Sequence, residues 1–136
     1  MEKLDLTHGR HVVYNLHAHL VFIPKYRRKI FTQEILNHLE KMFNACCLKF
    51  ESKLVEFNGE EDHVHLLISY PPKVSLSKLV NSLKGCSSRM IRKHRYPTIT
   101  NALWKGSLWS PSYFVGSCGG APIDLLRKYI ENQKVI

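Results

Sequence analysis

Apolar residues recur along this chain with two different periods, and the order of the periods restricts the folds that the chain can adopt. Alternation with a period of two predicts strands, and a period of about 3.6 predicts helices. We expect strands over residues 10–23, 52–58, 62–70 and 111–117. We expect helices over residues 33–50, 75–95 and 122–133. The order β-α-β-β-α-β-α is typical of an α+β protein, with a ferredoxin-like split β-α-β antiparallel sheet and an extra C-terminal helix.

Residues at the ends of these segments support the boundaries. Thr32 and Ser75 are suited to cap the first two helices, and Pro122 is suited to begin the third. Gly59 stands between the second and third strands, where we expect a tight turn. Residues 96–110 show neither period, so we expect an irregular segment there.

Size and charge narrow the class of protein. With 136 residues and no repeats or linkers, residues 1–136 are expected to form one domain. Twenty Lys and Arg against eleven Asp and Glu leave a net charge of +9. Such a field favours a polyanionic partner, first nucleic acid and second an anionic membrane, although a solvated basic surface is the plain alternative. No apolar run approaches the ~20 residues that span a bilayer, so we expect no membrane-spanning segment.

The cysteines say little about function. Cys46, Cys47, Cys86 and Cys118 contain no C-x-x-C pair, so a zinc knuckle is not expected. Free cysteines are commonly small buried residues. We therefore expect a reduced, cytoplasmic protein.

Two histidines on the third predicted strand form a candidate metal site. His63 and His65 are two residues apart, so both imidazoles leave the same face of the strand. An H-x-H pattern is also compatible with two hydrogen-bonded polar residues, and His17 and His19 form a rival pair on the first strand. The later pair is favoured because the acidic residues 60–62 precede it and suit a cation or its surrounding hydrogen bonds. The earlier pair would then line the neighbouring strand, close to the same site.

A tyrosine on the last predicted helix is a candidate nucleophile. Tyr129 and Gln133 stand four residues apart, so they share one face of the helix. Taken alone, a tyrosine at the boundary of a helix with a wet hydroxyl is an ordinary structural residue.

Three stretches carry a resemblance to a known family. They are HLVFIPKYRRKIF (19–31), EDHVHLLISYPP (61–72) and LWSPSYFVGSCGGAPIDLLRKYIENQ (108–133). In order and spacing the chain resembles the single-tyrosine HUH transposases, the TnpA type of the insertion-sequence 200/605 family. The resemblance spans nearly the whole chain.

The resemblance implies a role for each matching residue. His63 and His65 would bind Mg²⁺ or Mn²⁺, and Val64 would be the bulky apolar residue between them. Gln133 would supply a third metal ligand, and Tyr129 would be the nucleophile. Two imidazoles and one amide oxygen are softer ligands than Mg²⁺ prefers, so Mn²⁺ should bind at least as well.

The resemblance also implies a reaction and its partners. Such enzymes cleave and rejoin single-stranded DNA through a 5′-phosphotyrosine and recognise subterminal hairpins. They act as homodimers in which the tyrosine helix completes the partner's site. No membrane partner is implied.

Basic and aromatic residues provide candidate DNA contacts. A phosphate track is expected on the first loop and along the second helix, from Lys25, Arg27, Arg28, Lys29, Lys84, Arg89, Arg92, Lys93 and Arg95. Aromatic side chains can stack on unpaired bases or pack in the core, and the candidates are Tyr26, Trp104, Trp109 and Tyr113.

Two other functions compete with an active transposase. One is a nucleic-acid-binding module without cleavage activity, which would not need His63, His65, Tyr129 and Gln133 together. The other is a domesticated relative that nicks repeats without moving them.

Overall fold

The computed structural model describes residues 6–102, 107–117 and 131. In chain order its elements are β1 Thr7–His8, β2 Val13–Tyr14, β3 His17–Phe22, the 3₁₀ turn η1 Lys25–Arg27, α1 Gln33–Lys49, β4 Lys53–Glu60, β5 His63–Ser69, α2 Leu76–Lys93, α3 Pro97–Ala102 and β6 Phe114–Ser117. The predicted last helix, 122–133, lies outside the described residues apart from residue 131.

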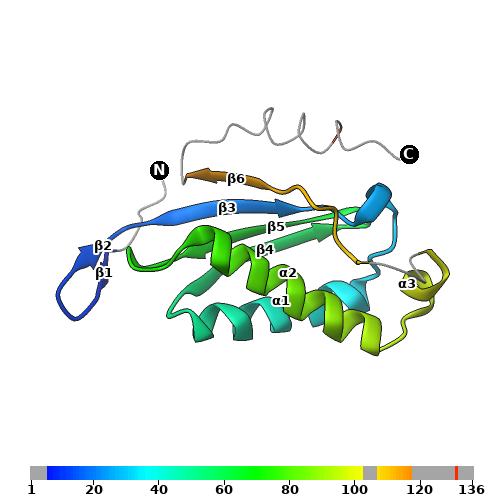
Figure 1. The fold of residues 1–136 in the computed structure, drawn as a ribbon, viewed down its shortest axis with the longest axis horizontal. Coiled ribbons are helices and arrows are strands. Elements are labelled where there is room, and N and C mark those ends of the chain that lie inside the picture. Colours follow the sequence, from blue (N-terminus) through cyan, green and yellow to red (C-terminus); the bar gives the residue numbers. More distant parts are fainter. Residues whose placement is uncertain (1–5, 103–106, 118–130, 132–136) are drawn as a thin grey trace.

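The main sheet has four strands in the order β4-β5-β3-β6, and every neighbouring pair is antiparallel. Strand β5 lies between β3 and β4, which are joined through α1, and this is the split β-α-β arrangement of a ferredoxin-like sheet. The predicted fold class is therefore confirmed. Helices α1 and α2 cover one face of the sheet (Figure 1).

The two helices begin where the sequence predicts. The side chain of Thr32 accepts a hydrogen bond from the Ile35 amide, and the side chain of Ser75 accepts one from the Lys78 amide. Both contacts satisfy amides that have no partner inside the helix.

The core lies between the sheet and the two helices. It holds Leu20 and Phe22 from β3 together with Val64, Leu66 and Ile68 from β5, all fully buried. These strand residues meet helix residues that recur at helical spacing, namely Ile35, Leu39, Phe43, Leu79, Val80 and Leu83. Since strand side chains alternate, the intervening residues of β3 and β5 lie on the face away from α1 and α2.

The structure differs from the sequence prediction in three places. The predicted strand 10–23 is interrupted: a small β1–β2 hairpin precedes β3. Gly59 lies inside β4 opposite Val64, and the turn follows at residues 61–62. A Cβ atom on Gly59 would lie 2.4 Å from a methyl carbon of Leu36, so glycine there permits the close approach of α1 rather than a turn.

The third difference is α3, which forms inside the segment predicted to be irregular. It is held by tertiary contacts: Ile99 is buried in the core, and the Thr98 hydroxyl donates to the Ile30 carbonyl. No helix in the described ranges is long and apolar enough to cross a bilayer.

Candidate functional site

The predicted metal pair lies at the start of β5. His63 and His65 are both partly buried, and Val64 between them is fully buried in the core. Both imidazoles therefore lie on the face of the sheet that α1 and α2 leave uncovered. The structure confirms that His63 and His65 lie on one face of the strand, as the H-x-H spacing predicts.

The imidazole of His63 is held by a neighbouring carboxylate. Its Nδ1 atom lies 3.0 Å from one oxygen of Asp62, and the other oxygen of Asp62 accepts a hydrogen bond of 3.0 Å from Arg27 Nε. The Asp62 side chain is only 14% exposed. A carboxylate bonded to one ring nitrogen orients the ring and leaves the other nitrogen available to a metal. Among the acidic residues 60–62, Asp62 is thus one whose carboxylate contacts an imidazole of the pair.

The rival pair contributes to the same face. His19 Nδ1 lies 2.9 Å from His65 Nε2, and the two rings are nearly parallel, with an angle of 9° between their planes. His17 lies two residues before His19 on β3, opposite Ser69. Within the described part of the chain, the Nδ1 atom of His17 is buried without a hydrogen-bond partner. His17 and His19 thus line the strand beside the candidate site, as expected.

Electrostatics keep the site in a form that can bind a cation. Burial alone would raise the pKa of Asp62, but hydrogen bonds and charges from His63 and Arg27 outweigh it and lower this pKa. Burial, and then the neighbouring His19, lower the pKa of His65, which favours its neutral form. The neutral form is the one in which a histidine such as His65 serves as a metal ligand.

The described side chains do not make a complete metal site by themselves. Among them, no group of three or more His, Cys, Asp and Glu residues is placed to hold a metal ion. The imidazoles of His63 and His65 suit a divalent ion such as Mn²⁺, and a further ligand has to come from elsewhere. Gln133 is the predicted third ligand, but both it and the predicted nucleophile Tyr129 lie outside the described residues.

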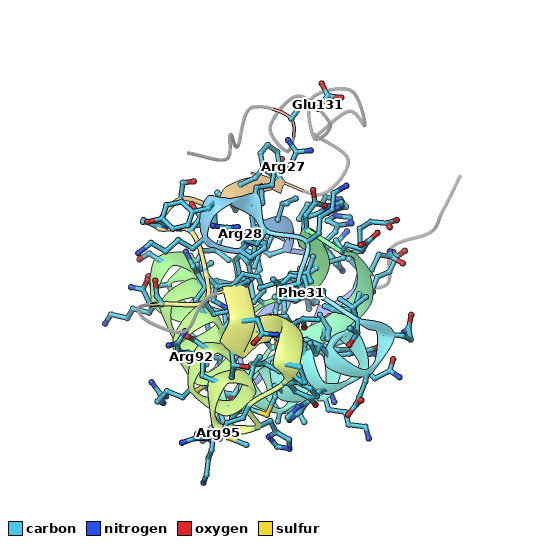
Figure 2. The ribbon with its side chains drawn as sticks, turned by 90° about the vertical axis from the view of Figure 1, so that its right-hand side faces the viewer. Arg27, Arg28, Phe31, Arg92, Arg95 and Glu131 are labelled. Carbon is cyan, nitrogen blue, oxygen red and sulfur yellow. The ribbon has the colours of Figure 1, made fainter. Side chains whose placement is uncertain are left out.

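One described residue belongs to the same C-terminal segment. Glu131 is two residues from Tyr129 and two from Gln133 in the sequence. Its carbonyl oxygen accepts a hydrogen bond of 3.3 Å from Arg27 Nη1. Figure 2 shows Arg27 pointing toward Glu131 at one end of the molecule.

The predicted DNA contacts fall into two groups. Arg28 and Lys29 on the first loop, and Arg89, Lys93 and Arg95 on or just after α2, are exposed. Lys25 and Arg92 are partly exposed. Figure 2 shows Arg28, Arg92 and Arg95 at the same end of the molecule. Exposed cations gathered in this way suit a phosphate backbone.

Two of the predicted cations contact protein groups in the structure. Arg27 is engaged by Asp62 and Glu131, as described above. Lys84 is half-buried; its ammonium group donates to the carbonyl oxygens of Ser110 at 2.7 Å and Pro111 at 3.3 Å. Burial lowers the pKa of Lys84. Lys84 thus fixes the loop that leads into β6.

The aromatic candidates also separate. Tyr26 is 42% exposed, so its ring is open to a base. Trp109 is only 3% exposed and packs against Phe22 and Phe31, which is the core alternative considered from the sequence. Tyr113 is partly buried against the core, and Trp104 lies outside the described residues.

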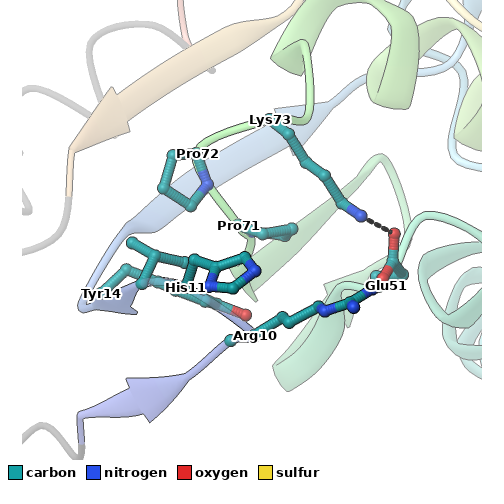
Figure 3. Close-up of a pocket in the computed structure, with 9 residues that line it drawn as sticks. Arg10, His11, Tyr14, Glu51, Pro71, Pro72 and Lys73 are labelled. Atoms are coloured by element: carbon teal, nitrogen blue, oxygen red, sulfur yellow. Dashed lines mark ion pairs between the residues drawn. The ribbon is translucent and has the colours of Figure 1, made fainter.

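A cavity of about 540 Å³ lies at the other end of the sheet. It is formed by the β1–β2 hairpin and the loop after β5, where Arg10, His11 and Tyr14 face Pro71 and Pro72 (Figure 3). An ion pair between Lys73 and Glu51 closes one side. Among the described residues that line it, none is a predicted metal ligand or DNA contact.

Known proteins resemble this chain over almost its whole length. It is 32% identical over 130 residues to the ISDra2 transposase TnpA of Deinococcus radiodurans, covering 96% of this chain and 92% of that protein. It is 29% identical over 132 residues to the transposase for insertion sequence element IS200 of Salmonella typhimurium, covering 97% of this chain and 84% of that protein.

Solved structures share the fold. A crystal structure described as a transposase from Deinococcus radiodurans superposes with a TM-score of 0.85 at 31% identity, covering 96% of this chain and 99% of that one. The structure of a REP-associated tyrosine transposase bound to a REP hairpin superposes with a TM-score of 0.53 at 11% identity, covering 92% and 68%; it supports the fold alone. The family described as "Transposase IS200 like" matches residues 12–133. The chain therefore belongs to the IS200-like transposases, the family of the IS200/605 TnpA proteins.

Proposed function

We propose that this transposase cleaves and rejoins single-stranded DNA at the ends of an insertion sequence, with Tyr129 as nucleophile. The observation that supports this most directly is the pair His63 and His65 on the sheet face opposite α1 and α2, with the ring of His63 held by Asp62. A protein that only binds nucleic acid has no use for an imidazole pair oriented in this way.

The proposed ligands of a divalent ion are His63, His65 and Gln133. A Mg²⁺ or Mn²⁺ ion bound there would polarise the scissile phosphate and favour the phenolate form of a nearby tyrosine. The role of the protein is to orient the donors: Asp62 fixes the ring of His63, and β5 places both rings on one face.

In the proposed cleavage, the Tyr129 hydroxyl loses its proton as its oxygen attacks a DNA phosphorus atom, and the bond from phosphorus to the 3′ oxygen breaks. The DNA 5′ phosphate stays on the tyrosine as a phosphodiester, and the departing 3′ oxygen takes up a proton. In the rejoining step a second 3′ hydroxyl attacks the same phosphorus, loses its proton and releases the tyrosine. One phosphodiester replaces another at each step, so no ATP is required.

We infer that the DNA partner is a single strand with a subterminal hairpin, because one protein of the same fold is described as bound to a REP hairpin. The proposed phosphate contacts are cations of the first loop and α2: the exposed Arg28, Lys29, Arg89 and Lys93, and the partly exposed Lys25 and Arg92. Arg27 was expected among them; in the structure its guanidinium group donates hydrogen bonds to Asp62 and to the Glu131 carbonyl.

A covalent-adduct assay tests the nucleophile and the metal. Wild-type protein, Mn²⁺ and end-labelled single-stranded DNA with a hairpin should give a protein–DNA adduct on a denaturing gel. Tyr129→Phe and His63→Ala should each abolish the adduct, and EDTA should do so in the wild type. Tyr129→Phe should still bind the DNA, with an affinity that falls as salt rises. An adduct formed by Tyr129→Phe at the wild-type rate would exclude this tyrosine as nucleophile.

The proposed homodimer, with sites completed in trans, requires a separate test. A mixture of the Tyr129→Phe and His63→Ala proteins should regain adduct formation if one protomer supplies the tyrosine and its partner the histidines. If both come from one chain, the mixture should stay inactive. Sedimentation of the mixture reports whether dimers form at all.

A further inference from the structure

A groove of about 450 Å³ lies between α2 and residues 107–111, the segment that leads toward β6. Its wall on the other side of these residues is one face of α2, where the lining residues recur at helical spacing: Lys84, Gly85, Ser88 and Arg89. The volume falls within the range of roughly 300–1,000 Å³ that is typical of sites for small ligands. The groove therefore has room for a ligand group of the size of one nucleotide.

The two walls of the groove are fixed to each other. The ammonium group of Lys84 donates to the Ser110 carbonyl at 2.7 Å, and the Trp109 indole donates to the Ser87 hydroxyl at 2.9 Å. Each contact joins α2 to the segment 107–111. Because these side chains are already ordered, a ligand that enters the groove does not have to order them, and binding costs less entropy.

Gly85 lies in the middle of α2, where glycine is less favourable than alanine because it loses more backbone freedom on folding. Outside the helix's own backbone, a Cβ atom at this position would meet only the tip of Arg89 among the described residues, at an ordinary distance of 3.4 Å from Nη1. Packing of these residues thus does not require glycine here, in contrast to Gly59. The space above Gly85 is instead part of the groove.

The charge and polarity of the groove match an anion with an apolar part. Arg89 is exposed, and its guanidinium group lies beside the space above Gly85. None of the described residues that line the groove is acidic, and the lining atoms are mostly apolar. Pro111 is exposed on the opposite wall, whereas Trp109 is only 3% exposed and its ring stays in the core. A nucleotide combines the two properties, a charged phosphate and an apolar base face.

We propose that this groove binds one unpaired nucleotide of the DNA strand, with its phosphate on Arg89 and its base packed over Gly85 against Pro111. The inference rests on the proposed function, from which it takes the DNA partner. A base within a duplex is stacked on both faces, so only a nucleotide outside the paired stem can enter. Gly85 is then a specificity-determining residue, because any side chain at this position occupies the place of the base.

Gly85→Ala distinguishes a binding effect from a folding effect, since the two have opposite signs. The Tm should rise by about 2–4 °C, because alanine is the better residue inside a helix. The affinity for single-stranded DNA should fall about fivefold or more, which is the loss expected when a base loses its packing surface. Gly85→Leu should fall further, because leucine fills more of the groove, and its Tm should not drop below that of the wild type.

Binding is measured by fluorescence anisotropy of a labelled strand that carries a hairpin and an unpaired flank, in EDTA so that no metal-dependent cleavage occurs. Asn81→Gln is the matched control. Asn81 is exposed one turn before Gly85 on α2 and does not line the groove, and the change adds one methylene group. This variant should keep both the wild-type affinity and the wild-type Tm. A loss in Asn81→Gln equal to that in Gly85→Ala would overturn the assignment to the groove.

Salt dependence separates the phosphate from the base. Arg89→Ala should lower the slope of log affinity against log salt by about 0.7, the value for one phosphate contact on single-stranded DNA. Gly85→Ala should keep the wild-type slope, because the phosphate contact remains. An unchanged slope in Arg89→Ala would overturn the placement of the phosphate.

Abasic DNA identifies the occupant of the groove. Each nucleotide outside the paired stem is replaced in turn by one that lacks its base. At one position the replacement should weaken binding to the wild type, and the same replacement should cost Gly85→Leu less than about twofold, because its groove is already filled. Equal losses in the two proteins at every position would exclude a base from the groove.

Three other results would overturn the inference in distinguishable ways. If Gly85→Leu binds every strand like the wild type, and the wild type forms the covalent adduct, the groove is not a DNA site and the proposed function stands. If Gly85→Leu sediments as a smaller species than the wild type at equal concentration, a second copy of this chain covers the groove. If the wild type neither binds single-stranded DNA nor forms the adduct, the proposed function is wrong and the inference falls with it.

Discussion

A buried hydrogen bond between Trp109 and Ser87 makes a quantitative prediction about stability. The indole Nε1 donates to the Ser87 hydroxyl at 2.9 Å, and the two residues are 3% and 0% exposed. Ser87→Ala leaves this buried indole N–H without an acceptor, which typically costs about 1–3 kcal/mol. At about 2.1 cal/mol/K per residue, a domain of this length loses roughly 4–10 °C in Tm for that cost.

The assay is a double-mutant cycle in urea, followed by circular dichroism because the tryptophan itself is changed. In a Trp109→Phe background there is no N–H to satisfy, and the Ser87 hydroxyl still donates to the Leu83 carbonyl at 2.7 Å. Ser87→Ala should then cost less than about 0.5 kcal/mol, close to the error of additivity. An equal cost in both backgrounds would refute the assignment of the destabilisation to the indole.

The same variants test the place of Trp109 in DNA binding. Residues on either side of it are fixed to the strand end before η1: the Lys25 amide donates to the Leu108 carbonyl, and the Ser110 amide donates to the Ile23 carbonyl. Trp109→Phe should therefore lower stability but leave the affinity of the folded protein for single-stranded DNA within about twofold. A larger loss would mean that the indole reaches a base after all.

Three further predictions concern the fold. Burial, and then the charges of His94 and Lys41, lower the pKa of His38, so on acidification the unfolded chain binds this proton before the folded chain does. The free energy of unfolding should therefore fall as pH drops below about 6.5 and level off below the pKa of the folded state. His38→Gln should reduce this dependence of the free energy of unfolding on pH, measured by urea titration. Gly59→Val should cost about 1–3 kcal/mol by overpacking against Leu36, measured by thermal unfolding, with Gly9→Val in the exposed β1–β2 hairpin as a comparison. Burial raises the pKa of Cys47 to about 12, so an aromatic disulfide reagent at pH 8 should modify the partly exposed Cys86 well before Cys47.

The strand and helix periods were enough to predict the fold class and both long helices, because the segments that form the core bury one side along most of their length. The H-x-H spacing predicted the shared face of His63 and His65 for the same reason. Periodicity failed where contacts distant in sequence decide the structure. The short helix α3 is held by a hydrogen bond to the Ile30 carbonyl and by packing in the core. Glycine at position 59 permits the close approach of Leu36 on α1 and does not form a turn.

The contacts of Arg27 could not be predicted from the sequence around it. The sequence around it reads as a basic loop, and nothing local distinguishes Arg27 from Arg28. What distinguishes them is the left-handed backbone that sends one side chain toward Asp62, 35 residues away, and leaves the other exposed. The sequence shows that Asp62 precedes the H-x-H pair, but only the fold shows that its cationic partner is Arg27.

The turn between β4 and β5 limits which mutations the H-x-H strand can accept. The Glu61 carbonyl accepts hydrogen bonds from the amides of both Ile30 and Phe31, so the two-residue turn is tied to the chain that leads into α1. An inserted residue before His63 would separate it from Asp62, and one at Val64 would send the two histidines to opposite faces. An insertion or deletion in this hairpin would therefore disrupt the arrangement of the two histidines, whereas a substitution leaves the strand register unchanged. At position 64 the side chain is determined by packing in the core between the sheet and the helices, where Val64 is fully buried.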